Sequence, residues 1–294
     1  MQTVRFSGQA CVALENAWLR LLVAQSVGPR LLFLGLDGSG NLLAELPDLV
    51  VERPGAEPFH FYGGHRLWAA PEDLGRTYLP DDALVEIAAV PDGLLVTQNL
   101  EPGTGLQKSI QVVLAADRPR LVLIHRLTNR GGRPVSCAPW SITQFRTGGL
   151  AILPQATTDT GLLPNRSVAL WPYTDPYDEA VAWGKSCILV RGNMTRPFKL
   201  GFPNPRGWLA YWLDGILFVK HAAYDPQAAY YDSGSSSEFY CNNRFLELET
   251  LAPIGTIPPG GSAAHVETWD LYGNIEPPRD EQEAQALTAR LRLE

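Results

Sequence analysis

Short stretches of alternating apolar and polar residues, separated by turn-forming residues such as Pro91-Asp92-Gly93, recur along almost the whole chain. This period of two is typical of half-buried strands, and strands at roughly 8–15-residue spacing indicate packed antiparallel sheets. The pattern predicts strands at 17–25, 31–36, 84–90, 94–98, 106–115, 121–128, 135–145, 186–191, 197–202, 208–213 and 216–221. The chain of 294 residues is therefore expected to be an all-β protein.

One helix is expected, at 279–293, where Ala284, Leu287 and Leu291 keep helical spacing among charged residues. We expect it to cover an edge of the sandwich as an amphipathic lid. The segments 152–185 and 222–243 are rich in Pro, Tyr or Ser and are expected to be irregular loops. No linker or repeat divides the chain, so residues 1–294 are expected to form one domain.

Composition excludes several partners. The net charge of −7 and the pI near 5.3 argue against binding to nucleic acid or to an anionic membrane. The sequence has no apolar run of the roughly 18 residues that a membrane span needs and no secretory signal, so a cytoplasmic protein is expected. The four cysteines contain no CxxC pair and are expected to be buried thiols.

The C-terminal residues 245–271 contain two alternating runs around a Pro/Gly-rich turn, which predicts a hairpin. In the first run Phe245, Glu247 and Glu249 share a face, and in the second run His265, Glu267 and Trp269 do so. Ionised carboxylates are costly to bury without partners, so these glutamates are exposed, paired or functional. If the strand lines a hollow in the sheet, one of them is a candidate general base.

A second group of chemically capable residues follows Gly63-Gly64, where His65, Arg66 and Trp68 come within four positions. His65 can exchange a proton near neutral pH, Arg66 offers a planar fork of donors, and Trp68 is a flat apolar surface. The alternative is that His65 and Arg66 only pair with nearby acids such as Glu72 and hold the loop in place.

Lys199 and Lys220 stand at strand positions among apolar residues. Either their ammonium groups reach solvent along the side-chain stem, or both converge on a ligand. With Trp140 and Asn204 they add the aromatic and polar groups that a polyhydroxylated, sugar-sized ligand needs. A metal site from His65, His221, Glu247 and Glu249 would have no diagnostic spacing, and we expect neither a metal nor another cofactor.

Several segments resemble the aldose 1-epimerases, or galactose mutarotases. The opening LENAWLRLLVAQSVGPRLLFLGLDGSGNLLAE and the segment HRLTNRGGRPVSCAPWSITQF are similar to that superfamily in general. FYGGHRLWAAPE, PFKLGFPNPRGWLAYW and FLELETLAPIGTIPPGGSAAHVETWDL resemble one branch of it, of the DUF4380 type. The resemblance covers roughly residues 10–275 and implies a large antiparallel β supersandwich with a sugar site on a concave sheet.

The resemblance also implies roles. A strand glutamate in an LET-like context is the general base of mutarotases, which here is Glu249 in ELET, and a histidine protonates the ring oxygen, for which His65 is the candidate. From the residue chemistry described above, and not from the resemblance, the expected substrate-binding residues are Arg66, Trp68, Lys199, Lys220, Trp140, Glu247 and Asn204. The segment PWSITQF lacks the second histidine that mutarotases use.

Three functions follow as hypotheses. The first is an aldose-epimerase-like enzyme acting on a sugar or an anionic sugar derivative by general acid–base ring opening. The second is a carbohydrate-binding protein without catalysis, and the third is a polysaccharide lyase or hydrolase. For the first two hypotheses the expected partner is a small-molecule carbohydrate, neutral or anionic. The sequence does not indicate the oligomeric state.

Overall fold

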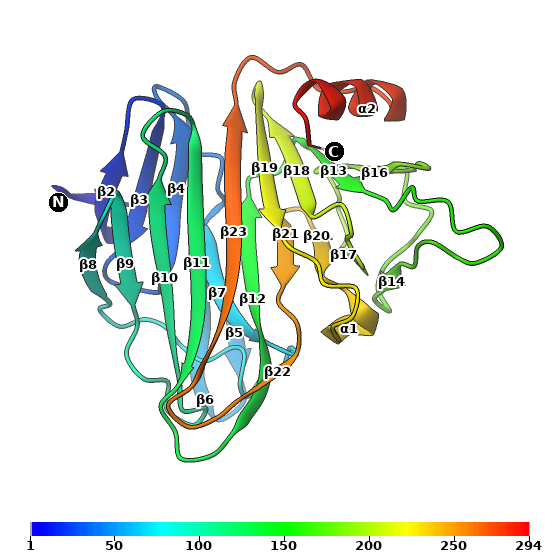
Figure 1. Ribbon diagram of the computed structural model, residues 1–294. Helices are drawn as coiled ribbons and strands as arrows, with labels where there is room; N and C mark the ends of the chain where they lie inside the picture. Colours follow the sequence, from blue (N-terminus) through cyan, green and yellow to red (C-terminus); the bar gives the residue numbers. More distant parts are fainter. Residues whose placement is uncertain (1, 294) are drawn as a thin grey trace.

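Two antiparallel β-sheets lie face to face in the computed structural model, which describes residues 2–293 (Figure 1). The larger sheet has eleven strands, and ten of them follow the order β1 (Gln2–Phe6), β2 (Gln9–Glu15), β3 (Leu19–Ala24), β4 (Arg30–Leu36), β7 (His65–Ala70), β12 (Val135–Phe145), β21 (Leu246–Leu251), β20 (Ser237–Cys241), β17 (Phe198–Phe202), β14 (Ala169–Leu170). The eleventh strand, β22 (Gly255–Ile257), pairs with β12 away from this path.

The smaller sheet has ten strands, in the order β15 (Val181–Trp183), β16 (Cys187–Arg191), β13 (Leu150–Pro154), β18 (Trp208–Leu213), β19 (Ile216–Ala222), β23 (Ser262–Tyr272), β11 (Arg120–Asn129), β10 (Leu106–Leu114), β9 (Gly93–Thr97), β8 (Glu86–Val90). A separate hairpin is formed by β5 (Glu45–Arg53) and β6 (Ala56–Gly63). The prediction of an all-β protein made of packed antiparallel sheets is therefore confirmed.

The core between the sheets is built from the alternate residues of each strand. On the larger sheet these include Leu67, Phe145 and Leu248, and on the smaller sheet Phe218 and Trp269, all of them buried. The rings of Phe145 and Phe218 lie 4.8 Å apart across the interface. Full burial of such side chains contributes about 1.5–3 kcal/mol each, so this layer holds the two sheets together.

The expected hairpin at 245–271 is wrong. Strands β21 and β22 belong to the larger sheet and β23 belongs to the smaller one, so the chain crosses between the sheets after Ile257. The alternation in each run correctly gives the two faces of each strand. It does not give the hydrogen-bonding partner, because any antiparallel neighbour satisfies the same alternation.

The C-terminal helix α2 (Glu281–Arg290) is confirmed and packs against the outer face of the smaller sheet, as the upper right of Figure 1 shows. Its Asp280 N-cap accepts a hydrogen bond from the Glu283 backbone N–H, and its Ala284 and Leu287 join the apolar cluster of that face. Within residues 2–293, neither helix is long and apolar enough to span a membrane.

The expected irregular segments contain some regular structure. The first includes β14 and β15, and the second includes the single-turn helix α1 (Tyr231–Gly234) and strand β20. Strand β20 matters for function, because it lies beside β21 in the middle of the larger sheet.

Candidate functional site

Charged and aromatic side chains gather on the outer face of the larger sheet, the face turned away from the smaller sheet. The pleat sets this arrangement, because Arg66, Glu247 and Glu249 alternate along β7 and β21 with core residues such as Leu67 and Leu248. The register of β21 with β20 places Glu249 opposite Glu238, and that of β17 with β20 places Lys199 opposite Tyr240. With Trp140 on β12, groups from five neighbouring strands thus meet on one surface.

A cavity of about 350 Å³ opens on this surface, and we call it the outer-face cavity. Four of its lining residues carry charge, namely Arg66, Glu72, Lys199 and Glu247. Aromatic side chains form most of the remaining wall: Phe61, Trp68, Tyr78, Trp140, Tyr173, Tyr240 and Phe245. Flat apolar surfaces around a few polar groups are typical of a site for a small ligand.

Arg66 and Glu247 form one buried ion pair in this wall. The Arg66 Nη2 donates to Glu247 Oε1 at 3.1 Å, and the guanidinium carbon lies 4.2 Å from the centre of the Trp68 ring. The Nε and Nη1 atoms of Arg66 are buried and have no hydrogen-bond partner among residues 2–293. Burial raises the pKa of Glu247 to about 7, although Arg66 acts in the opposite direction. This carboxyl can therefore both give and take a proton near neutral pH.

Lys199 lies between two further carboxylates. Its Nζ is 2.8 Å from Glu238 Oε2 and 3.1 Å from Glu249 Oε2. Burial alone lowers the pKa of Lys199, but Glu238 and Glu249 outweigh burial and hold the pKa well above its usual value. Burial, reinforced by Glu249, raises the pKa of Glu238 well above its usual range, despite Lys199. Lys199 is thus a fixed cation with its charge already matched.

Glu249 is fully buried and does not line the cavity. Its Oε2 accepts hydrogen bonds from Trp140 Nε1 at 2.8 Å and from Lys199 Nζ at 3.1 Å. Its Oε1 has no partner in the described part of the chain. Glu249 therefore stands directly behind Trp140 and Lys199, two residues that do line the cavity.

A second polar cluster, the inner network, lies between the two sheets and is closed to solvent. His65 on β7 reaches His125 on β11, with 2.7 Å between their Nε2 atoms. His125 Nδ1 is 3.1 Å from the carbonyl oxygen of His265, and His65 Nδ1 is 2.9 Å from Thr143 Oγ1. The outer-face cavity and the inner network are thus on opposite faces of the larger sheet.

The hydrogen-bond partners of His65 and His125 determine which ring nitrogen of each carries a proton. A carbonyl oxygen only accepts, so His125 Nδ1–H donates to His265. Burial lowers the pKa of His65 well below its usual value and lowers that of His125 too, so both rings are neutral. His125 Nε2 then accepts from His65 Nε2–H, and His65 Nδ1 accepts from the Thr143 hydroxyl.

Glu267 and Lys220 complete the inner network. Lys220 Nζ lies 3.1 Å from Glu267 Oε1 and donates to the Leu248 carbonyl at 3.0 Å. Glu267 Oε2 accepts from Trp269 Nε1 at 2.8 Å, and the Thr250 hydroxyl donates to Oε1. Burial alone raises the pKa of Glu267, but Lys220 and the histidines outweigh burial and keep it well below the usual value.

One group of potential metal ligands exists in this network. The ligand atoms of His65, His125 and Glu267 lie within 4.8 Å of one another. Both oxygens of Glu267 already accept hydrogen bonds, and the Lys220 ammonium beside them would repel a cation. The chemistry of the donor set therefore fits a structural hydrogen-bond network rather than a metal centre.

The structure brings together most of the residues that the sequence proposes for the site. Arg66, Trp68, Trp140, Lys199 and Glu247 line the outer-face cavity, and Glu249 lies directly behind them. The roles of these residues stay predictions.

Three residues lie elsewhere. His65 and Lys220 both face the interior of the sandwich. His65 lies on the inner face of the larger sheet, opposite the cavity, and Lys220 belongs to β19 of the smaller sheet. The expected acid–base pairing of His65 with Glu249 is therefore wrong. Asn204 follows β17, where its amide donates to the Trp208 carbonyl and the Ser237 hydroxyl, so its contacts hold the backbone in place.

The sequence interpretation missed that Glu238 and Tyr240 stand on a central strand, because the Ser-rich surroundings indicated a loop. The signal was present in residues 237–241, SEFYC, where Glu238 and Tyr240 alternate with the buried Phe239 and Cys241. Phe61, Tyr78 and Tyr173 of the cavity wall come from segments without strand neighbours in the larger sheet, and no pattern in the sequence joins them to it.

Solved structures share this architecture. A presumed aldose 1-epimerase from Klebsiella pneumoniae superposes with a TM-score of 0.62 at 12% identity, over 97% of this chain and 83% of that one. A galactose mutarotase-like protein from Lactobacillus casei superposes with a TM-score of 0.56 at 10% identity, over 89% of this chain and 100% of that one. A presumed aldose 1-epimerase from Escherichia coli K12 superposes with a TM-score of 0.55 at 12% identity, over 90% of this chain and 99% of that one.

The fold is that of the galactose mutarotase-like proteins. This likeness confirms the supersandwich that the sequence resemblance implies. No protein-family profile matches the chain, and no curated protein matches it. Identities of 10–12% carry the fold alone, so the more specific DUF4380-type branch stays a prediction.

Proposed function

We propose that the protein is an aldose-epimerase-like enzyme that binds a sugar in the outer-face cavity and opens its ring by general acid–base catalysis. The observation that carries the proposal is a carboxyl group, Glu247, at the wall of an aromatic-lined cavity with a pKa of about 7. A general acid or base works best when its pKa is near the operating pH. The fold shared with galactose mutarotase-like proteins supports the same reading.

Glu247 takes the place that the sequence reasoning gave to His65. In this scheme the protonated Glu247 gives its proton to the ring oxygen as the bond from that oxygen to the anomeric carbon breaks. The anomeric hydroxyl loses its proton to a base, the open chain rotates about its first carbon–carbon bond, and closure gives the other anomer. Positioned acids and bases typically contribute about 10²–10⁴-fold each.

Glu249 remains the proposed base, acting through its unpartnered Oε1. Because Trp140 and Lys199 stand between this carboxylate and the cavity, contact with the substrate requires one of them to shift. If neither shifts, Glu249 instead acts as a positioning residue that holds Lys199, and Glu247 exchanges both protons. The variants below separate these two roles.

The charges of the site favour a neutral sugar over an anionic derivative. Lys199 is matched by Glu238 and Glu249, and the wall carries Glu72 as well as the Arg66–Glu247 pair, so no net positive charge faces the cavity even when Glu247 is protonated. Two donor atoms of Arg66, Nε and Nη1, have no partner among residues 2–293 and can donate to a pair of sugar hydroxyls.

The test is anomer exchange measured by NMR on neutral sugars, uronates and sugar phosphates. We expect acceleration with a neutral sugar and a loss of about 10²-fold or more in Glu247→Gln. A similar loss in Glu249→Gln with unchanged sugar affinity supports it as base, whereas a loss of affinity supports the positioning role. Wild-type protein that accelerates no sugar on the panel would contradict the proposal.

A binding protein without catalysis is the second candidate, and one observation favours it. No histidine of residues 2–293 lines the outer-face cavity, so the ring oxygen lacks the acid that mutarotases use. Sugar-dependent shifts of cavity residues without accelerated exchange would select this candidate.

A further inference from the structure

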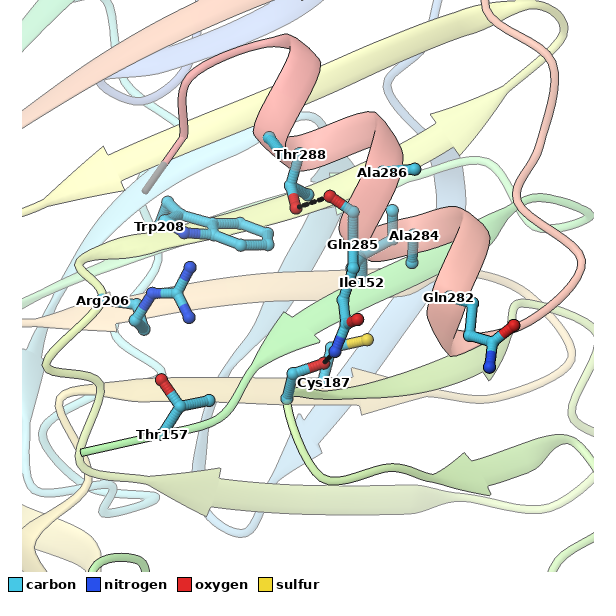
Figure 2. A pocket seen from close by; sticks show the side chains of 12 residues that line it. Ile152, Thr157, Cys187, Arg206, Trp208, Gln282, Ala284, Gln285, Ala286 and Thr288 are labelled. Atoms are coloured by element: carbon cyan, nitrogen blue, oxygen red, sulfur yellow. Dashed lines mark hydrogen bonds between the residues drawn. The ribbon is translucent and has the colours of Figure 1, made fainter. Parts of the chain in front are cut away.

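Helix α2 covers only one part of the outer face of the smaller sheet. Over β13 and β18 it encloses a cavity of about 700 Å³, with Ala284 on the helix side and Ile152 and Trp208 on the sheet side (Figure 2). Farther along the sheet, no element of residues 2–293 lies over β8, β9, β10 and β11, which stand uncovered at the front of Figure 1. We call the outward side of these four strands the open face.

The registers of these strands arrange the side chains of the open face in rows that cross the sheet. The first row has one residue from each strand, each directly opposite the next: Glu86, Thr97, Ser109 and Arg126. A step of two residues along every strand gives the second row, which holds Ala88, Leu95, Gln111 and Ile124. All of these side chains are half-buried or exposed, and the two charges stand at opposite ends of the first row.

Glu86 and Arg126 are not partners within one chain. Three strand spacings of about 4.8 Å place them about 14 Å apart across the sheet. Both are exposed, and neither forms an ion pair within residues 2–293, where Arg126 donates to the Ser262 hydroxyl. The open face therefore presents one negative and one positive group at a fixed separation.

A second copy of this chain complements the open face when a twofold axis runs along the strands between β9 and β10. Each β8 residue then faces the β11 residue of the same row in the partner, and each β9 residue faces the β10 residue. Glu86 meets the partner's Arg126, and Arg126 meets the partner's Glu86, as a symmetric interface requires. Sheets packed face to face keep their strand directions within about 30° of each other, so the rows stay opposed near the axis.

The uncharged rows also fit each other in size under this axis. In the second row the small Ala88 faces the partner's Ile124, and in the next row Gly93 faces the partner's Val113. A large side chain thus meets a small one, and the two sheets can approach to the usual distance of about 10 Å. Neither row contains a charged residue, so no charge is buried there without a partner.

The size of the open face indicates how stable such a dimer is. Four strands about 4.8 Å apart and on average about seven residues long give a face of about 19 by 24 Å. This is at the lower end of the sizes of specific interfaces. We therefore expect a reversible dimer whose population depends on protein concentration.

We propose that the protein forms a twofold dimer through the open face, with two Glu86–Arg126 ion pairs at its rim. The apolar rows supply the binding energy, and the charges fix the register of the two sheets. The inference does not rest on the proposed function, because the outer-face cavity belongs to the other sheet and stays accessible in the dimer.

The first test is sedimentation velocity of the full chain from about 1 to about 300 µM, where the dimer fraction should rise with concentration. Ile124→Glu places a carboxylate against the partner's Ala88 and should raise the dissociation constant at least about tenfold. Leu162→Glu is the matched control, because Leu162 is fully exposed outside the open face and should leave the dissociation constant unchanged. Thermal melts followed by circular dichroism verify that each variant is folded.

Charge reversal tests the pairing itself. Glu86→Arg and Arg126→Glu should each weaken self-association at least about tenfold, because like charges then face each other twice. An equimolar mixture of these two variants should restore the dimer, since every facing pair in the mixed species again joins opposite charges. This recovery needs contact between two chains, so it does not depend on Ile124→Glu being folded. The proposal is overturned if wild type stays monomeric at every concentration, if folded Ile124→Glu dimerises as wild type does, or if the mixture associates no better than its components.

Discussion

Replacing Lys220 by Met should strongly destabilise the protein. Lys220 and Glu267 are both fully buried, and their charged atoms lie 3.1 Å apart. Methionine has a similar length and fits the apolar surroundings, but it leaves the Glu267 carboxylate without its cation. Removal of one partner of a buried pair typically costs about 3–5 kcal/mol of unfolding free energy. Trp269 and Thr250 still donate to Glu267, so we expect a loss near 3 kcal/mol at pH 7.

The double variant Lys220→Met/Glu267→Gln isolates the pair. With neither charge present, no unpaired carboxylate remains buried. The unfolding free energy of the double variant should therefore return to within about 1–2 kcal/mol of the wild-type value. The double-mutant cycle should therefore give a coupling free energy of about 2–3 kcal/mol. Urea denaturation at pH 7, with midpoint and slope fitted for all four proteins, measures it.

The exposed Lys185 provides the control, since Lys185→Met should change the unfolding free energy by less than about 0.5 kcal/mol. At pH 5 the Lys220→Met loss should shrink, because the unpaired Glu267 can bind a proton. Additive single effects, or a Lys220→Met loss under 1 kcal/mol, would refute the assignment of the inner network to stability.

Three further predictions concern the pH dependence of stability and the N-cap of helix α2. Burial lowers the pKa of His265 to about 4, so on acidification the unfolded state binds a proton before the folded state does. The contribution of His265 to the unfolding free energy is therefore complete above pH 6.5 and falls by up to about 3 kcal/mol as the pH is lowered toward 4. A series of urea melts across this pH range measures the loss. The pKa of Glu247 is raised to about 7, so the folded wild type loses stability as the pH rises from 4.5 to 7 and this carboxyl ionises. Glu247→Gln has no such group, so its unfolding free energy relative to wild type should rise by up to about 3 kcal/mol over the same range. A difference that does not change with pH would argue against the raised pKa. Asp280→Ala removes the N-cap of α2 and should cost about 1 kcal/mol in urea melts, with faster amide hydrogen exchange confined to α2. Asp280→Asn keeps the cap and should behave as wild type.

The fold was largely predictable because its signal is local. Most expected strands agree with the structure to within one or two residues, including 135–145 and 208–213, which match β12 and β18. Each of these runs alternates cleanly, since one face meets the core and the other meets solvent or a second layer. The order of strands in the sheets was not predictable from alternation, as the crossing of the chain between β21 and β23 shows.

The candidate site was predictable in part for the same reason. Glu247 and Glu249 were recognised as unusual because carboxylates on a central strand need partners, and Arg66 and Lys199 are those partners. Their pairing across β7, β21 and β17 depends on register between distant segments, which no local pattern encodes. The sequence could therefore identify the participants but not the pairs.

His65 and Arg66 show how much one position matters. They are adjacent in the sequence, yet the pleat sends Arg66 to the outer-face cavity and His65 to the inner network. Once His65 is inside, every proton on it and His125 has a partner, so the histidines stabilise the contact between the sheets and are unavailable to a substrate. Proton transfer in the outer-face cavity then depends on carboxyl groups, and burial is what brings Glu247 into the required pKa range. A catalytic role for this cavity therefore predicts a pH profile set by Glu247 with an apparent pKa near 7, absent in Glu247→Gln, whereas a profile that survives the substitution would assign the proton transfer to another group.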